Sequence, residues 1–569
     1  MAKKILIIGA VALGPKVACR LRRINPDAQI TVLDRDSVIS YGGCGIPYYV
    51  GGDVADIEGL RSTQSHAVRN QKFFKDIKGI DVIVEVEAIE ILRKEKQVRV
   101  RYLKENNREE LMDYDKLVIA TGASPVRPPF PGSDLPNVCI VSNLHHAENI
   151  KAKIAQGKVS KAVVIGAGAI GIEMAEALTD LWGVETTIIE MADQVLPAAL
   201  GKNVATVVQR QLEKHNVTVQ LSERVEKIVE KDGGESMTII TGHGEIDCDL
   251  VVLSTGVRPN TTLAQEAGLA IGSFGGILVD RRMRTSDPNI YAGGDCTEIR
   301  NLISGENMTM PLGSLANRQG RIIATNINGG SSHFKGTVGT FCMKVFEMGV
   351  ATSGLSYHQA IRVGYDPAIA IVSQADRAHF YPESEVMYIT LIADKKTRRI
   401  LGIEAVGKMG DAVKARVDAV AAMLEYGVEV DKVCDLETGY APPYASAMDI
   451  INNAGNTLDN ILDGRNKNIS PVCFLEEFKE DPNIRVIDVR EKVQVEKLVE
   501  KYGDRWIHIP QEEMRSRYNE IPTEGQVFLV CDTGTRSYEA QVVLVANGVT
   551  HTRHIQGGMS LIKVHDPDF

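Results

Sequence analysis

The chain has 569 residues, of which 44% are hydrophobic and 24% charged, and its formal net charge is -10. At roughly 100–200 residues per domain, this length predicts three or four globular domains of ordinary composition. The acidic balance argues against a nucleic-acid partner. No run approaches the roughly 18 apolar residues of a membrane span, so we expect a cytoplasmic protein without a membrane partner.

The first predicted element is a strand at residues 4–8, whose continuous apolar run is typical of a strand buried in a parallel sheet. A glycine turn from Gly9 to Gly14 follows, and after a helix-like stretch a second strand ends at Asp34. This is the order of a Rossmann unit, in which the turn holds a pyrophosphate and the carboxylate holds a ribose. Val11 stands where the middle glycine is usual, so this motif taken alone is an imperfect match.

A second and more regular unit begins with the apolar strand 162–165. Gly166, Gly168 and Gly171 complete a G-x-G-x-x-G turn before a helix-like stretch, and the next strand ends at Glu190. A carboxylate there accepts a hydrogen bond from an adenosine 2′-hydroxyl and repels a 2′-phosphate, which favours NADH over NADPH. The alternative for Glu190 is a solvated side chain at a strand end.

Three later segments, 117–122, 253–259 and 285–295, each carry a strand that runs into a turn of small residues. In this order, and with the two Rossmann units, they resemble the pyridine nucleotide-disulfide oxidoreductase family over roughly residues 1–450. The resemblance implies FAD as well as NADH, and it assigns Asp295 to a hydrogen bond with the ribityl chain of the flavin. The predicted cofactor-binding residues are Gly9, Gly14, Asp34, Arg35, Thr121, Gly122, Gly166, Gly168, Gly171, Glu190, Gly256, Asp295 and Ala316.

Cys44 lies in the sequence Ser-Tyr-Gly-Gly-Cys-Gly-Ile-Pro-Tyr at residues 40–48. Other members of the family carry a C-x-x-x-x-C pair here, whereas this chain has one cysteine. It resembles the single-cysteine branch, which includes coenzyme A-disulfide reductase, NADH-dependent persulfide reductase, NADH peroxidase and NADH oxidase. By this resemblance, Tyr381 and Tyr440 contribute phenolic hydroxyls to the Cys44 site of the other subunit of a homodimer. Ordinary interface packing is the alternative for both tyrosines.

The thiolate is the reactive form of cysteine, so we expect a positive field to lower the pKa of Cys44. Two residues depart from the pattern that binds coenzyme A, because Gly43 replaces an Asn and Met448 replaces a Lys. Coenzyme A is therefore only a candidate ligand or substrate moiety, bound through basic residues of the first helix. A solvated helix face is the alternative for those residues. The predicted substrate-binding residues are Lys16, Arg20, Arg23, Ser40 and Gly43.

Near the C-terminus, a buried strand at 527–530 delivers Cys531 into a loop that contains Gly534 and Arg536. Successive amides before a helix form an anion cradle that stabilises a thiolate or a persulfide, and Arg536 adds positive charge. With Asp-Val-Arg at 488–490, the loop resembles the rhodanese domain. The alternative for Cys531 is an inert buried cysteine. The chain contains nine cysteines and no C-x-x-C pair, so neither a disulfide framework nor a metal site is predicted.

These features predict an α/β protein with two Rossmann-like dinucleotide-binding domains, an α+β dimerisation domain and a C-terminal α/β rhodanese domain. The predicted boundaries are 1–150 and 265–325 for the two parts of the FAD-binding domain, 151–264 for the NAD(P)H-binding domain, 326–450 for the dimerisation domain, 451–468 for a linker, and 469–569 for the rhodanese-like domain.

The predicted function is FAD-dependent reduction, by NADH, of small-molecule persulfide, polysulfide, or coenzyme A disulfide or persulfide sulfur at Cys44. Cys531 carries sulfane sulfur to or from that site. Two alternatives stay open. One is an NADH peroxidase or oxidase that uses a Cys44 sulfenic acid. The other is a non-catalytic persulfide sensor or carrier.

Overall fold

A parallel five-stranded sheet forms around the first glycine turn in the computed structural model, which describes residues 2–569. The apolar run at the N-terminus becomes its central strand, β1, and the core lies on both faces of the sheet. The strand order is β19-β7-β1-β2-β3, so strand β19 joins the sheet from a distant part of the sequence. The strands are β1 (Lys4–Ile8), β2 (Gln29–Leu33), β3 (Asp81–Ile83), β7 (Lys116–Ile119) and β19 (Ile290–Ala292).

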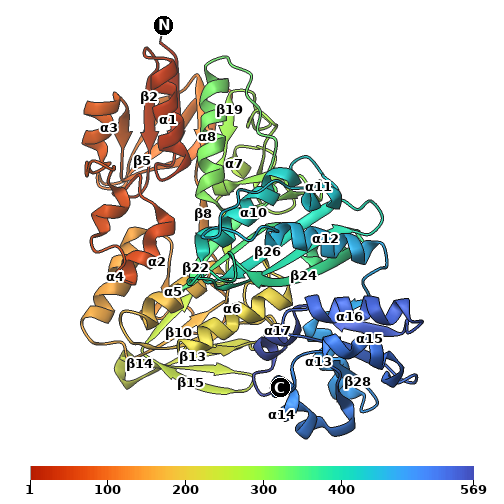
Figure 1. Cartoon of the computed structure of the whole chain (residues 1–569). Helices are drawn as coiled ribbons and strands as arrows, with labels where there is room; N and C mark the ends of the chain where they lie inside the picture. The colour runs from red at the N-terminus through yellow and green to blue at the C-terminus, as the bar shows by residue number, and fades with distance from the viewer. Residues whose placement is uncertain (1) are drawn as a thin grey trace. The chain divides into compact units, whose positions relative to one another are not determined.

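Two helices of this region matter for the site. Helix α1 (Leu13–Ile24) follows the glycine turn and packs along α8 (Gly313–Ile327) (Figure 1). Helix α8 comes from the same late segment of the chain as β19. The two parts of the sequence predicted to share the first dinucleotide-binding domain are therefore interleaved in one core.

A second parallel sheet has the order β12-β11-β10-β16-β9. Its strand β9 lies before residue 150, so the boundary predicted at that residue is too late. The reason is the parallel pairing of β9 with β16, which a sequence pattern does not reveal. The elements are β9 (Val138–Ile140), β10 (Lys161–Ile165), β11 (Glu185–Ile189), β12 (Thr218–Gln220), β16 (Leu250–Leu253) and helix α5 (Ala169–Thr179).

The chain divides into two compact units. The first comprises Met1–Met191 and Asn216–Thr337, and holds both sheets described above. The second comprises Ala192–His215 and Val338–Phe569. No helix among residues 2–569 combines the length and the apolar character required to cross a bilayer.

The second unit contains an antiparallel sheet of order β22-β23-β26-β25-β24. All eight positions of β26 are buried, as expected when helices cover both faces. Figure 1 shows α10 and α12 on one side of this sheet and α6 on the other. The elements are β22 (Phe341–Val345), β23 (Met348–Gly354), β24 (Pro367–Ala375), β25 (Val386–Asp394), β26 (Ile400–Gly407), α6 (Lys202–Lys214), α10 (Gly410–Leu424), α11 (Val430–Cys434) and α12 (Ile450–Leu462).

The prediction of a linker at 451–468 is wrong for most of that segment, because helix α12 occupies it as far as Leu462. Asp449 caps the helix by accepting a hydrogen bond from the Ile451 amide at 3.0 Å. The helix packs on β24 and β25. The Asn- and Gly-rich composition that suggested a loop serves close packing instead.

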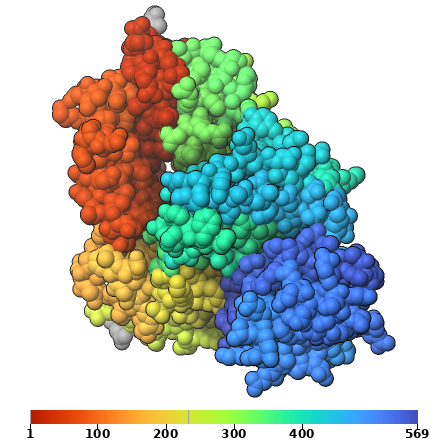
Figure 2. Space-filling model, in the orientation of Figure 1, coloured from red at the N-terminus to blue at the C-terminus, as the bar shows by residue number. Residues whose placement is uncertain are grey.

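Residues after α12 form a five-stranded parallel sheet of order β27-β31-β30-β28-β29 with its own aromatic core. In Figure 2 these residues make one rounded lobe, coloured blue. This C-terminal lobe and the antiparallel sheet belong to the same compact unit. The elements are β27 (Asn468–Ile469), β28 (Arg485–Asp488), β29 (Trp506–His508), β30 (Val527–Val530), β31 (Thr552–Ile555), α13 (Pro471–Glu480), α14 (Lys492–Tyr502), α16 (Thr535–Ala546) and α17 (Gly558–His565).

Candidate active site

Cys44 lies in a short 3-10 turn, Gly43–Gly45, directly before helix α2 (Ile46–Val50). The residue is exposed, and no disulfide joins it to another cysteine. Leu60 supports the turn from behind. Its carbonyl accepts the Gly42 amide at 2.8 Å, and a Cβ at Gly45 would lie only 2.4 Å from its side chain. The turn therefore presents one accessible thiol on a fixed backbone.

The charges around Cys44 differ from the prediction. Partial burial of the thiol group, although the residue has an exposed surface, is the largest cause that raises the pKa of Cys44, followed by the carboxylates of Glu173 and Asp295. We expected a positive field to lower this pKa. Backbone amides oppose this effect, among them the amide of Gly313 at the first residue of α8. The groups that stabilise the thiolate are therefore backbone amides, and the charged side chains that act on it are acidic.

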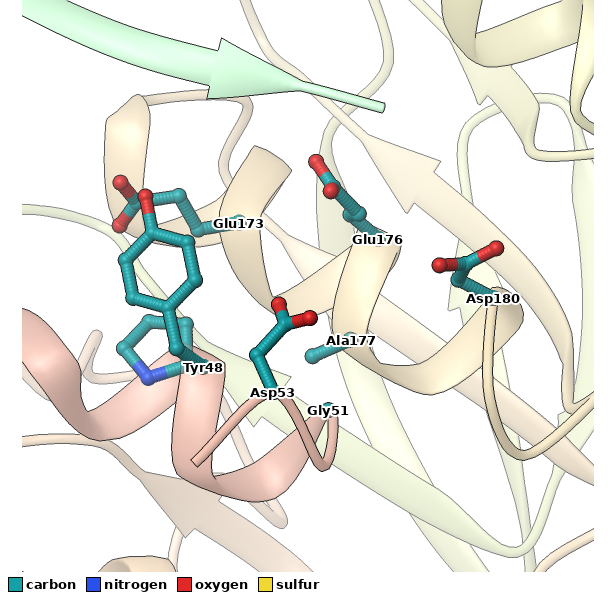
Figure 3. A pocket seen from close by; sticks show the side chains of 8 residues that line it. Tyr48, Gly51, Asp53, Glu173, Glu176, Ala177 and Asp180 are labelled. Atoms are coloured by element: carbon teal, nitrogen blue, oxygen red, sulfur yellow. The ribbon is translucent and has the colours of Figure 1, made fainter. Parts of the chain in front are cut away.

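Glu173 was not among the predicted site residues. It lies on α5, two residues after Gly171, and burial followed by repulsion from Glu176 raises its pKa to about 7. A hydrogen bond from the Tyr48 hydroxyl acts in the opposite direction, and Figure 3 shows the two side chains facing each other. Since Tyr48 is four residues after Cys44, its place in the cysteine motif was the signal available in the sequence.

Glu173 and Tyr48 line a small pocket of the first unit with about 300 Å³ of empty volume (Figure 3). Three further carboxylates point into it, so its wall is strongly acidic. The lining residues are Pro47, Tyr48, Gly51, Asp53, Glu173, Glu176, Ala177 and Asp180.

The first glycine turn is as tight as its sequence predicts. Gly9 has a φ of +110°, and a Cβ there would lie 2.1 Å from the Ala120 carbonyl oxygen. A Cβ on Gly14 would lie 1.9 Å from the oxygen of Gly9 itself. Both glycines are therefore required by the close approach of strand, turn and helix.

The second glycine turn has the same construction and one additional feature. Gly166 and Gly171 face backbone atoms at 2.6 Å and 2.0 Å, whereas Gly168 has no atom within 4 Å of the position a Cβ would take. The middle glycine of the motif therefore faces open space at the start of α5. That space suits a pyrophosphate held by the amides of a helix N-terminus.

A carboxylate closes each turn. Asp34 accepts the Ala10 amide at 2.6 Å, and Glu190 accepts the Ala167 amide at 2.7 Å. Burial raises the pKa of Asp34, and Arg35 beside it is exposed. The structure thus places both predicted ribose-binding carboxylates at the turns expected to hold a dinucleotide.

Asp295 lies in the turn after β19, where burial alone raises the pKa of its carboxyl to about 6. This carboxylate accepts no hydrogen bond from residues 2–569, which leaves it available for a ligand hydroxyl. Gln319 of α8 accepts the neighbouring Gly294 amide at 2.6 Å. The remaining predicted cofactor residues lie on adjoining turns and on α8, namely Thr121, Gly122, Gly256 and Ala316.

The predicted substrate residues occupy two places in the first unit. Lys16, Arg20 and Arg23 recur at helical spacing on one face of α1. Arg20 is half-buried, and its Nε has no hydrogen-bond partner among the described residues. Ser40 is buried, with a φ of +52°, and its amide donates to the Ala10 carbonyl at 2.8 Å. Gly43 is exposed beside Cys44.

Cys531 follows β30 and is only 1% exposed. Its Sγ accepts the Gly534 amide at 3.1 Å and lies 3.6 Å from the Ser537 hydroxyl, at the start of helix α16. One amide of the expected cradle is therefore directed at the sulfur. Arg536 forms an ion pair with Asp532, so the nearest acidic side chain already balances its charge.

Tyr381 and Tyr440 lie in the second unit, on two loops of the antiparallel-sheet region. Tyr381 is half-buried in the loop 376–385 between β24 and β25, whereas Tyr440 is 53% exposed in the loop 435–449 before α12. Their roles depend on a second subunit and stay predictions. Within residues 2–569 no cluster of three metal-ligating side chains occurs, and all nine cysteines are free.

Two parallel sheets, each with a glycine turn and a carboxylate at its strand ends, are the framework of a dinucleotide-binding protein. Residues 3–320 match the family described as pyridine nucleotide-disulphide oxidoreductase, and residues 340–450 match its dimerisation domain. The chain therefore belongs to the pyridine nucleotide-disulphide oxidoreductase family.

Several similar proteins match most of the chain. The structure of a NAD-dependent persulfide reductase from A. fulgidus is 40% identical with a TM-score of 0.92, and the match covers 98% of this chain and 99% of that one. Reduced CoADR-RHD of Bacillus anthracis is 32% identical with a TM-score of 0.90, covering 100% and 99%. The NAD(P)H coenzyme A polysulfide/persulfide reductase of Pyrococcus horikoshii is 34% identical over 79% of this chain and 97% of its own length.

The family implies FAD and a nicotinamide nucleotide, and the residues present fit both groups. The unpaired carboxyl of Asp295 and the tight turn at Gly9 suit a flavin dinucleotide in the first sheet. The open space above Gly168 and the carboxylate of Glu190 suit a nicotinamide dinucleotide in the second.

Proposed function

We propose that the protein is an FAD-dependent NADH oxidoreductase that reduces persulfide, polysulfide or coenzyme A disulfide sulfur at Cys44. The observation that carries the proposal is the accessible thiol of Cys44, on which the Gly313 amide at the start of α8 and the Asp295 carboxylate of the first sheet both act. A lone cysteine has no resolving partner in its own turn. Any disulfide or persulfide at Cys44 must therefore include sulfur from outside this turn.

A persulfide substrate, R–S–SH, reacts at Cys44 in two steps. The thiolate attacks the outer sulfur of the persulfide, so that a new S–S bond forms at Sγ and the S–S bond of the substrate breaks. The leaving group R–S⁻ takes a proton from a phenol. Two electrons then break the new S–S bond, restoring the thiolate and releasing hydrosulfide. The sum is R–S–SH + NADH + H⁺ → R–SH + H₂S + NAD⁺. When bound, FAD supplies the two-electron relay between NADH and sulfur.

The side chains around Cys44 have complementary parts in this scheme. The Gly313 amide stabilises the thiolate, while Glu173 and Asp295 raise its pKa. A thiolate of higher pKa is intrinsically the stronger nucleophile, so these carboxylates favour attack once the thiolate has formed. Tyr381 and Tyr440 serve as proton donors from the second subunit of a homodimer.

The C-terminal lobe acts as a rhodanese domain in this proposal, with Cys531 as the carrier of sulfane sulfur. The Gly534 amide and the start of α16 provide the positive end of backbone dipoles at its sulfur. Sulfur bound there is either delivered to Cys44 or received from it. The lobe can hold sulfur but has no group that supplies electrons.

Two details of specificity belong to the same proposal. Glu190 favours NADH over NADPH, because its carboxylate repels a 2′-phosphate. Lys16, Arg20 and Arg23 form a basic face on α1 that suits the phosphates of coenzyme A.

Steady-state NADH oxidation with polysulfide, a small persulfide, coenzyme A disulfide, peroxide and oxygen tests the proposal. We expect sulfur acceptors to be preferred and Cys44→Ser to abolish their reduction while sparing an artificial one-electron acceptor. Cys531→Ser should slow the reduction of polysulfide but not that of the small persulfide. A preference for peroxide or oxygen would establish the peroxidase or oxidase alternative, and purified protein without flavin absorbance would favour the sensor.

A further inference from the structure

Arg416 is a buried arginine beneath the two loops that carry Tyr381 and Tyr440. It lies on α10, its side chain is 10% exposed, and it forms an ion pair with Asp449 at 2.8 Å, whose side chain is 3% exposed. A buried ion pair loses solvation on both members and is retained only where further hydrogen bonds compensate.

The guanidinium of Arg416 also donates to two backbone carbonyls, one in each loop. The Nη2 atom, which also bonds to Asp449, lies 3.0 Å from the Asp376 carbonyl oxygen and 3.1 Å from the Tyr444 carbonyl oxygen. Asp376 opens the loop that carries Tyr381, and Tyr444 lies four residues after Tyr440. A single planar group therefore fixes the backbone of both loops at once.

Direct contacts complete the junction between the loops. The Ala378 amide donates to the Pro442 carbonyl at 3.2 Å, and the Ser446 hydroxyl donates to the Arg377 carbonyl at 3.0 Å. Within the Tyr381 loop, the Asp376 carboxylate accepts the Glu385 amide at 3.0 Å and closes the hairpin. The loops are thus a connected layer that rests on Arg416.

We propose that Arg416 is a positioning residue, which sets the loops of Tyr381 and Tyr440 in one register so that their phenols reach the sulfur at Cys44 of the other subunit. The proposal rests on the proposed function. The planar guanidinium matters, because Nε and Nη2 both face the Asp449 carboxylate while Nη2 reaches the two loop carbonyls. A lysine keeps the charge opposite Asp449, but its single, more flexible nitrogen does not hold these directions at once.

The test compares full-length Arg416→Lys with wild type, Tyr440→Phe and the double variant. We expect Arg416→Lys to lower kcat for persulfide about tenfold, because a small misplacement of a proton donor is costly, with KM for NADH and reduction of ferricyanide unchanged. In the Tyr440→Phe background, Arg416→Lys should lower kcat by less than about twofold, because it acts through the hydroxyl that Tyr440→Phe has already removed.

Matched variants separate positioning from folding. Arg398→Lys alters an arginine that pairs with Asp459 on α12 and with Asp463 directly after the helix, so it should leave kcat unchanged. Ser446→Ala removes only one contact between the loops and should lower kcat about two- to fivefold. Flavin content and thermal midpoint, measured on every variant, establish that the compared proteins are folded.

Mixed dimers assign the effect to the correct subunit. Dimers of an Arg416→Lys chain with a Cys44→Ser chain contain one site with an intact Cys44 from the first chain and intact loops from the second. The mixed dimers should therefore be more active toward persulfide than either parent dimer. Unchanged kcat in Arg416→Lys, or an equal loss in the Tyr440→Phe background, would overturn the inference. Unchanged kcat in Tyr440→Phe would instead overturn the assigned role of the tyrosine in the proposed function.

Discussion

The side-chain oxygen of Gln556 lies 2.6 Å from the backbone nitrogen of Ile371, and this hydrogen bond joins the C-terminal lobe to the antiparallel sheet of the second unit. Ile371 belongs to β24, an edge strand whose outward amides have no neighbouring strand. Exposed edges of this kind pair readily with other chains, and Gln556 covers this one. Its amide nitrogen also donates to Asn468 at 2.6 Å, so both ends of the side chain are engaged.

Replacing Gln556 with Ala should loosen the lobe. The change leaves the buried Ile371 amide without an acceptor, at a cost of about 1–3 kcal/mol. We expect limited proteolysis between α12 and β27 to become several-fold faster. Gln494→Ala, at an exposed position of α14, is the matched control and should match wild type. Equal cleavage rates for all three proteins would show that other contacts hold the lobe in place.

Coenzyme preference should depend on Glu190. The Ala167 amide fixes this carboxylate at the end of β11, where it meets the adenosine ribose in the proposed complex. Glu190→Ser removes the repulsion of a 2′-phosphate, so kcat/KM for NADPH should rise about tenfold relative to NADH. Glu185→Ser, at the opposite end of the same strand, should leave the ratio unchanged. If Glu190→Ser leaves it unchanged as well, the carboxylate does not face the ribose.

The sequence patterns predicted strands well where local composition decides the structure. The run at residues 4–8 is β1, and both glycine turns fold as their spacing indicated. Helix α12 was missed because its Asn and Gly residues resemble a loop. In the fold, the Asn452 amide nitrogen donates to the Cys434 carbonyl at the end of α11 and to the Leu436 carbonyl just after it, at 3.0 and 2.8 Å. A Cβ on Gly455 would lie 2.8 Å from the Cys434 nitrogen. Such packing depends on tertiary contacts that a local pattern does not contain.

The sequence also could not predict the acidic surroundings of Cys44, because they too depend on tertiary contacts. Glu173 and Asp295, which raise its pKa, lie far away along the chain and reach the site only through the fold. The cysteine motif predicted the nucleophile, but the field around it depends on α5 and on the turn after β19.

Removing the charge of Glu173 should make Cys44 more acidic. Since the Glu173 carboxylate raises the pKa of the thiol, Glu173→Gln should move the midpoint of iodoacetamide alkylation of the reduced enzyme to lower pH. Glu173 is charged above about pH 7 in the wild type, so its effect is present over the whole range in which a thiol of raised pKa ionises. Asp53→Asn changes another acid of the same pocket that is not among the groups acting on Cys44, and it serves as the control. Identical alkylation profiles would contradict the assigned coupling.

Glu404 should make the stability of the fold depend on pH. It lies on β26, is 2% exposed, and burial raises its pKa to about 7, while the Gly201 amide at the start of α6 donates to it at 2.9 Å. One carboxyl oxygen and the hydroxyl of Thr390, its cross-strand neighbour, have no hydrogen-bond partner among the described residues. Burial therefore favours the protonated acid.

Because the folded protein holds this proton more tightly than the unfolded chain, the contribution of Glu404 to stability is fully present below about pH 4.5 and is lost as the pH rises toward 7. Glu404→Gln keeps an acceptor for Gly201 but cannot ionise. As the pH rises from 5 to 8, the free energy of unfolding of the variant should therefore increase relative to that of the wild type, by up to about 3 kcal/mol. Chemical denaturation at both pH values measures this change, with Glu226→Gln on the exposed face of β13 (Val225–Lys231) as control. A difference between Glu404→Gln and wild type that stays constant with pH would show that Glu404 is ionised in the folded protein throughout this range.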